Sequence, residues 1–219
     1  MPFRSAFLIP EEIPWGHGAV MMCSSSTSLH ALRKARLQAG ESVAVFGAGG
    51  LGMSAIQLAF AFGARQVFAV DIREAKLDLA QRLGAIPIDA SAGNPVEMLR
   101  KSTGGRGVDV ALELIGLPQV MKQALQSLAI LGRLAIAGIT DRIFDVASYE
   151  ELLGREAEII GVSDHLAMEI PLLIDLVLQG KLRLSEIVTQ TVPLDAGAIN
   201  RALDNLEQFD HQIRAVIKP

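Results

Sequence analysis

The sequence predicts a doubly wound α/β fold built on a six-stranded parallel sheet. Two observations predict it: short apolar runs alternate with helical patterns along the chain, and each run is hydrophobic almost without interruption. Continuous hydrophobicity is typical of strands buried on both faces of a parallel sheet. The regular alternation of strand and helix then indicates right-handed crossovers between neighbouring strands.

Six apolar runs are expected to be strands. The third contains Pro87, which weakens it as a central strand because proline donates no hydrogen bond to a ladder. The runs are Val43–Phe46, Val67–Val70, Ile86–Ile88, Val110–Leu114, Leu134–Ala137 and Glu158–Ile160.

Helices fit the gaps between the runs. Glycine is favoured just past a helix end, and Gly63, Gly84 and Gly180 each follow a helical pattern. Proline suits a first helical turn, where its missing N–H has no partner to lose. The expected helices are Met53–Phe62, Glu74–Leu83, Pro118–Leu128 and Pro171–Gln179.

Two flanks break this rhythm. The first holds no clear strand and one expected helix, Ser28–Leu37. The last holds two strand-like pieces, Ile187–Val192 and Ile213–Ile217, on either side of an amphipathic helix with Asp195 as its cap. Neither piece has an obvious partner strand in the chain. We therefore expect three parts: an N-terminal flank over 1–40, a nucleotide-binding domain over 41–183 and a C-terminal segment over 184–219.

Composition excludes several classes of protein. The 219 residues include 20 basic and 24 acidic side chains, a net charge of −4, which argues against a broad basic surface for nucleic acid. The 50% hydrophobic content excludes intrinsic disorder. The uncharged stretch Ser42–Ala64 is long enough to span a membrane, but its glycines favour a strand, a turn and a helix. A short apolar run at Ala6–Ile9 and a single cysteine predict a cytoplasmic protein.

The sharpest motif is Gly47-Ala-Gly-Gly-Leu-Gly52, directly after the first strand. In this G-x-G-x-x-G pattern, Gly47 permits the tight turn, Gly49 lets the backbone approach a pyrophosphate, and Gly52 lets helix and strand pack closely. The amides of Gly50 and Leu51 open the helix and are placed to hold phosphate oxygens. The motif predicts a dinucleotide-binding turn of the Rossmann type.

An acid in the expected place supports this interpretation. Asp71 ends the second strand, 24 residues after Gly47. Its carboxylate can accept both hydroxyls of an adenosine ribose and would repel a 2′-phosphate, so NAD is favoured over NADP. NADP stays open because Arg73 lies close enough in sequence to receive a phosphate. The alternative to a cofactor site is a tight turn without a ligand and a solvent-facing aspartate.

With these residues in view, the sequence resembles the medium-chain, zinc-type alcohol dehydrogenase family from about Phe7 to Pro219. The matching blocks are Met21–Leu32, Gly40–Gly52, Val70–Lys76, Gly107–Gly116, Gly132–Gly138 and Gln212–Ile217. The resemblance implies hydride transfer between an alcohol and NAD. It also implies a barrel-like catalytic domain, to which nothing here is similar. We expect the cofactor domain plus a segment that normally returns to the catalytic domain, so that the end strands lack their sheet partners.

The resemblance places Cys23 at the third zinc-ligand position. A catalytic zinc needs three protein ligands, and the sequence has neither a Cys-x-x-Cys pair nor histidines at ligand spacing. We therefore expect zinc in the parent family but no competent zinc site here. Without the metal, Cys23 is expected to behave as a small buried hydrophobe.

Five further residues match cofactor-binding positions of the family, each with a simpler alternative. Thr27 matches a position beside the nicotinamide, or caps a helix. Lys76 matches a ribose contact, or is a solvated lysine. Arg214 matches a residue that reaches the pyrophosphate with its forked donors. Ile115 and Ile139 would line the adenine or nicotinamide slot, with ordinary core positions slightly favoured.

Two other groups of polar residues receive structural interpretations. His30 is expected to be a satisfied structural histidine on its helix. The acids Glu150, Glu151, Glu156 and Glu158 are expected to form a solvated face.

The expected function is that of an NAD(H)-binding domain of a zinc-type alcohol dehydrogenase-like oxidoreductase, inactive as this chain alone. One alternative is a zinc-free NADPH quinone or enoyl reductase relative, against which Cys23 and Asp71 argue. Another is a non-enzymatic, nucleotide-sensing Rossmann module. A methyltransferase-like domain fits less well, because its glycine turn is usually shorter. A homodimer joined edge to edge through Ala157–Val162 is expected.

Overall fold

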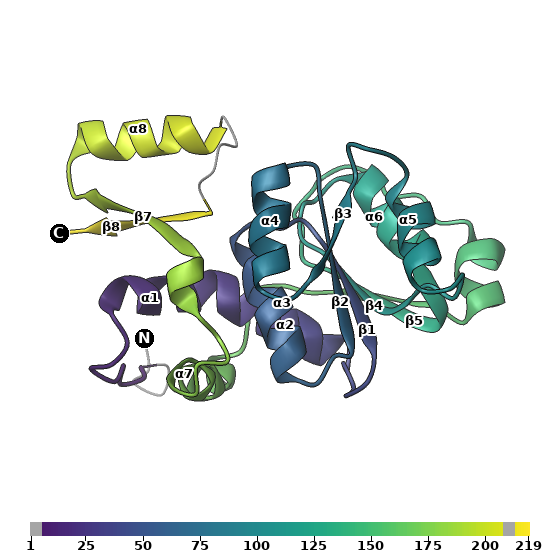
Figure 1. The fold of residues 1–219 in the computed structure, drawn as a ribbon, viewed down its shortest axis with the longest axis horizontal. Helices are drawn as coiled ribbons and strands as arrows, with labels where there is room; N and C mark the ends of the chain where they lie inside the picture. Colours follow the sequence, from purple (N-terminus) through teal and green to yellow (C-terminus); the bar gives the residue numbers. More distant parts are fainter. Residues whose placement is uncertain (1–5, 208–212) are drawn as a thin grey trace.

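The computed structural model describes residues 6–207 and 213–219. Its main body is a six-stranded sheet in the order β3-β2-β1-β4-β5-β6, with every neighbouring pair parallel. Figure 1 shows helices α2, α3 and α4 on one side of this sheet and α5 and α6 on the other. This strand order is that of the doubly wound dinucleotide-binding fold, so the predicted fold class is confirmed.

All six predicted strands are present. The strands are β1 (Ser42–Phe46), β2 (Gln66–Asp71), β3 (Ile86–Asp89), β4 (Val108–Glu113), β5 (Leu128–Ile136) and β6 (Glu158–Gly161). Pro87 lies in β3, at one edge of the sheet, where a missing N–H costs least. The fifth strand begins at Leu128, six residues before its predicted start, so the preceding helix ends earlier than expected.

Helices account for most of the remaining chain. They are α1 (Trp15–Val20), α2 (Ser26–Lys34), α3 (Gly50–Ala61), α4 (Glu74–Arg82), α5 (Pro95–Ser102), α6 (Pro118–Gln126), α7 (Ile170–Leu178) and α8 (Ala196–Glu207), with the π-helical turns η2 (Met21–Ser25) and η3 (Ser148–Leu152) and the 3₁₀ turns η4 (Leu153–Arg155), η5 (Ala167–Glu169) and η6 (Leu184–Glu186). The helix predicted at Ser28–Leu37 belongs to one helical run that starts at Trp15 and ends at Lys34. Helix α5 was missed because it is short; Asn94 caps it by accepting from the Val96 N–H at 3.0 Å.

The sheet is buried on both faces. Along β1, Val43 and Val45 join one core cluster, whereas Ala44 and Phe46 join another. The first cluster includes side chains of α2, α3, α4 and α7, and the second includes side chains of α5 and α6. Successive strand residues point to opposite faces, so both must be apolar, which explains the continuous hydrophobicity of the runs.

The end strands correct one expectation. Strands β7 (Val188–Pro193) and β8 (Arg214–Lys218) pair with each other in parallel, with Val192 beside Ile217. The expectation that each lacks a partner strand in this chain is wrong. Helix α8 lies between them in sequence and gives the crossover that a parallel pair requires. Figure 1 shows this small unit beside α1, away from the main sheet.

Among the described residues, no helix is both long and apolar enough to cross a membrane. The apolar stretch Ser42–Ala64 divides into strand β1, a turn and helix α3. The interpretation of that stretch as a strand, a turn and a helix is therefore confirmed.

Candidate functional site

The glycine turn joins β1 to α3 at the carboxyl edge of the sheet. Gly47 has a φ of +99°, a conformation that side-chain-bearing residues rarely adopt, and its N–H donates to the Val70 carbonyl at 2.9 Å. A Cβ on Gly52 would lie 2.0 Å from the Gly47 carbonyl oxygen. Helix and strand pack closely here only because both positions are glycine.

The middle of the turn faces open space. No atom lies within 4 Å of the position that a Cβ on Gly49 would occupy. Gly50 and Leu51 are the first residues of α3, so their N–H groups have no partner within the helix. The helix dipole adds a partial positive charge at this end, and together these features form an open cradle suited to an anion.

Arg214 brings a cation from β8 to the same cradle. A Cβ on Gly50 would lie 2.3 Å from Arg214 Nε, so the guanidinium rests directly against the start of α3. This Nε is buried and has no hydrogen-bond partner among the described residues. A buried donor without an acceptor is costly, and a cation beside a helix N-terminus is unfavourable. An anion held between the two would relieve both penalties, so the residues present fit a pyrophosphate.

Asp71 lies beside the turn at the end of β2. Its Oδ2 accepts from the Ala48 N–H at 2.8 Å, and its Oδ1 accepts from the N–H groups of Ile72 at 2.8 Å and Arg73 at 3.0 Å. These bonds fix the carboxylate against the glycine turn and keep its charge near the carboxyl edge of the sheet. The aspartate is held by backbone amides and does not extend freely into solvent.

Two residues of the predicted set lie on neighbouring helices. Lys76 is in the first turn of α4, half-buried. Thr27 is buried inside the helical run Trp15–Lys34, so its interpretation as a helix cap is wrong. The next residue, Ser28, donates its hydroxyl to the Leu51 carbonyl at 2.7 Å and so ties α2 to the start of α3.

Ile115 and Ile139 are exposed, at 44% and 95%, and the slight preference for core positions is wrong. A Cβ on Gly47 would lie 2.7 Å from Ile115 Cγ1, so this side chain covers the turn. A Cβ on Gly116 would lie 2.3 Å from the Ile139 carbonyl oxygen, which brings the loops after β4 and β5 together. Apolar side chains at this edge are suited to the flat faces of bases.

Comparison with known proteins identifies the family. Residues 50–179 match the family model described as zinc-binding dehydrogenase. A (R,R)-butanediol dehydrogenase of Bacillus subtilis is 30% identical over 97% of this chain, and an NAD-dependent alcohol dehydrogenase of Sulfurisphaera tokodaii is 31% identical over 92%. The chain belongs to the zinc-type alcohol dehydrogenase family. The crystal structure of the B. subtilis 2R,3R-butanediol dehydrogenase superposes with a TM-score of 0.89 at 30% identity, covering 97% of this chain and 60% of that one.

The match covers nearly all of this chain but only part of each relative. This zinc-type dehydrogenase chain spans about 60% of the length of the B. subtilis relative and 57% of the S. tokodaii relative. The predicted resemblance and the predicted Rossmann fold are both confirmed over the length that is shared.

The family's metal does not fit the residues of this zinc-type chain that the structure describes. Cys23 is exposed in the π-helical turn η2, so its expected burial is wrong. The reason is that Met21, Ser24 and Ser25 form the buried side of this turn, which leaves Cys23 outside. Within residues 6–207 and 213–219, no group of three His, Cys, Asp or Glu side chains is arranged to hold a metal ion.

Glu113 is a site-forming residue that the sequence reasoning did not select. It is fully buried at the end of β4, and its Oε1 accepts from the N–H groups of Ile115 at 2.9 Å and Gly116 at 2.8 Å. Burial raises the pKa of this carboxyl group. Oε2 lies 2.5 Å from where a Cβ on Gly138 would be and has no partner among the described residues. The signal that was available is an acid inside an otherwise apolar strand.

Proposed function

We propose that this chain is the NAD(H)-binding part of a zinc-type alcohol dehydrogenase-like oxidoreductase. The observation that carries the proposal is the convergence of the open cradle at Gly49, the unpartnered Arg214 Nε and the Asp71 carboxylate at one edge of the sheet. Ligands of doubly wound sheets bind at this edge, outside the carboxyl ends of the strands.

Each part of the proposed site has a separate task. Gly50, Leu51 and Arg214 would hold the pyrophosphate with N–H donors. Asp71 and Lys76 would hold the adenosine ribose, and the Asp71 carboxylate would select NAD over NADP. When bound, NAD supplies hydride transfer, and the protein supplies position and electrostatics.

The nicotinamide and adenine would lie along the apolar edge of the site. We assign Ile115 and Ile139 to the walls that exclude water from the base faces, and Thr27 to the helix beside the nicotinamide. Glu113 supports this edge indirectly, because it fixes the loop that carries Ile115.

The proposed reaction of the parent enzyme is reversible oxidation of an alcohol, a class that fits the names of the dehydrogenase relatives. As purified on its own, this chain is proposed to bind NAD(H) without turning over alcohols. Reduction of NAD by a panel of primary and secondary alcohols, measured at 340 nm against a heat-killed control, tests this. Alcohol-dependent NADH formation by the pure chain would contradict it.

Binding itself is tested through Arg214. A charge-assisted hydrogen bond contributes about 1.5–3 kcal/mol, so Arg214→Gln should weaken NADH binding about tenfold or more. Lys218→Gln is the matched control, because it removes an exposed cation from the same strand. NADH affinity is measured by nicotinamide fluorescence. Equal NADH affinities in the parent chain and in Arg214→Gln would show that Arg214 does not contribute to the cofactor site.

A homodimer through the free edge of the sheet is also proposed. Strand β6 is the last strand in the order and its outer side has no partner strand among the described residues. The predicted segment Ala157–Val162 contains this strand. Light scattering after size-exclusion chromatography should give twice the 23.4 kDa chain mass. A monomer at high concentration would contradict the proposal.

The single cysteine fits a proposed cytoplasmic location.

A further inference from the structure

A polar pocket lies away from the carboxyl edge of the sheet, where the glycine turn is. It has a volume of about 280 Å³ and opens between α5, α6 and the turns η3 and η4. Arg155 reaches its floor and donates to the carbonyl of Leu128, the first residue of β5, at 2.9 Å. The pocket therefore lies at the amino end of β5, whereas the glycine turn lies at the carboxyl edge of the sheet. Its lining residues are Val96, Arg100, Leu125, Gln126, Glu150, Glu151 and Arg155.

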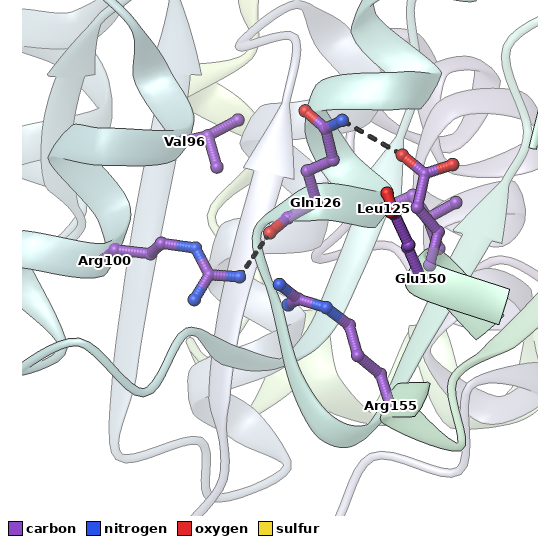
Figure 2. Close-up of a pocket in the computed structure, with 7 residues that line it drawn as sticks. Val96, Arg100, Leu125, Gln126, Glu150 and Arg155 are labelled. Atoms are coloured by element: carbon purple, nitrogen blue, oxygen red, sulfur yellow. Dashed lines mark hydrogen bonds between the residues drawn. The ribbon is translucent and has the colours of Figure 1, made fainter. Parts of the chain in front are cut away.

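Two guanidinium groups meet in this pocket. Figure 2 shows Arg100 and Arg155 turned toward each other from different elements. Arg100 donates to the Gln126 carbonyl at 2.7 Å and, at the longer distance of 3.4 Å, to the Gly105 carbonyl. Each guanidinium carries five N–H donors, so these bonds and that of Arg155 to Leu128 use only a minority of them. Within the part of the chain that the structure describes, neither arginine forms an ion pair with a carboxylate.

Two acids, Glu150 and Glu151, also line the pocket, but among the described residues neither forms an ion pair with the two arginines. Glu151 is buried, contrary to the predicted solvated face, and its carboxylate is already engaged. It accepts from Lys122 Nζ at 2.5 Å, from Gln126 Nε2 at 3.0 Å and from the Ala147 N–H at 2.8 Å. Glu150 is exposed at the rim. Two like charges thus face each other, and no carboxylate of the described residues is paired with either of them.

The electrostatics agree with this description. Burial, and secondly the positive charge of Arg155, lower the pKa of Arg100. Both effects disfavour the charged guanidinium, and a bound anion would reverse the second by screening the two cations from each other. Val96 and Leu125 form an apolar wall beside the charged groups. The volume of about 280 Å³ leaves room for a short organic group as well as the anion.

We propose that this pocket binds a small phosphate-type oxyanion, free or carried by a short phosphomonoester, between Arg100 and Arg155. Planar guanidinium forks match phosphate oxygens in pairs, which makes arginine the residue suited to this task. The site is separate from the glycine turn and does not depend on the proposed cofactor function.

The test is a calorimetric titration of the pure chain with inorganic phosphate, and then with glycerol 3-phosphate, in a phosphate-free, low-salt buffer. Saturable binding is expected, weakened at least tenfold in Arg100→Gln and in Arg155→Gln. Arg82→Gln, which removes an exposed cation at the end of α4, should bind as the parent does. Thermal melts of every variant show whether it is folded, and NADH affinity should be unchanged in all of them.

Two further variants make the result decisive. Glu150→Gln removes a negative charge from the rim and should tighten binding about two- to threefold, a gain that misfolding cannot produce. The part of phosphate binding that is lost in Arg100→Gln and in Arg155→Gln should persist in Arg214→Gln, which reports on any phosphate held at the glycine turn. Loss of phosphate binding in Arg214→Gln would place the anion at the glycine turn and overturn the proposal. Absence of saturable binding, or equal binding by the parent and both pocket-arginine variants, would overturn it as well. Tighter binding of glycerol 3-phosphate than of phosphate would identify a phosphomonoester as the ligand class, whereas equal binding would identify the free anion.

Discussion

Alanine at two glycines of the same turn should separate folding from cofactor binding. At Gly52, the added Cβ would lie 2.0 Å from the Gly47 carbonyl oxygen and 3.0 Å from its carbonyl carbon. Both atoms are backbone, so the turn itself must move by more than about 1 Å to bring the 2.0 Å approach to ordinary contact. Overpacking of this kind costs about 1–3 kcal/mol, and we take the upper end because no flexible side chain can yield.

At Gly49 the same methyl group meets no atom within 4 Å. Its φ of −82° and ψ of −161° are open to alanine. Loss of a favoured N-cap residue and reduced freedom of the unfolded chain nearly offset each other, so the free energy of unfolding should change by less than about 1 kcal/mol. The methyl group would, however, occupy the space that a pyrophosphate needs. NADH affinity should fall about tenfold or more, equivalent to about 1.4 kcal/mol.

The assay combines thermal unfolding, followed by circular dichroism, with titration of NADH fluorescence. A loss of about 3 kcal/mol should lower the Tm of Gly52→Ala by about 9 °C in a chain of this size. Gly49→Ala should melt with the parent and bind NADH poorly. A folded Gly49→Ala chain that binds NADH as tightly as the parent would refute the assignment of the turn as a dinucleotide cradle. An unchanged Tm in Gly52→Ala would refute the packing argument.

Three other predictions follow from single side chains. Burial raises the pKa of Asp109, but the hydrogen bonds from Arg106 and Ser42 outweigh burial and hold this pKa at about 2, below its ordinary 3.8. The charged Asp109 therefore stabilises the fold by about 2 kcal/mol above pH 5. This stabilisation is lost as the pH falls from about 4 to 2. Urea unfolding should show Asp109→Asn about 2 kcal/mol less stable at pH 7 and equal to the parent near pH 2; a constant difference would contradict this. Glu113→Ala leaves the buried N–H of Gly116 and the partly buried N–H of Ile115 unpaired and should cost about 3 kcal/mol in urea unfolding. Glu113→Gln keeps an acceptor and should cost less than half of that; equal losses would contradict the role of Oε1. Cys23 should react with a maleimide in the native chain at the rate of a small thiol, and protection until unfolding would show that it is buried.

The fold was predictable because local patterns and packing agree. The apolar runs of β1, β2 and β4 are continuous since both faces of the sheet are covered, and the glycines that end helices mark the boundaries correctly. Helix α5 escaped notice because its eight residues are too few for a clear period. The pairing of β7 with β8 was missed although the strand–helix–strand pattern is visible in the sequence, because the resemblance assigned both strands to a sheet shared with the family's catalytic domain.

For the candidate site, the positions of the main residues could be predicted from the sequence, but their exposure could not. The glycine turn and Asp71 are a contiguous motif and a spaced acid, so their positions follow from the chain. The exposure of side chains could not be predicted in the same way. Three exposed residues are apolar or weakly polar, and such residues are expected in the core by default: Ile115, Ile139 and Cys23. Glu113 was missed although it is an acid inside an apolar strand, because its contacts with the Ile115 and Gly116 N–H groups depend on the shape of the folded loop.

We propose that the glycine turn and Asp71 form an NAD-selective site. Titration of the pure chain with NADH and, separately, with NADPH tests it most directly. NADH binding should be saturable, NADPH binding should be weaker, and Asp71→Ala should lose this preference. Binding of NADPH as tight as that of NADH, or binding of neither cofactor, would contradict it.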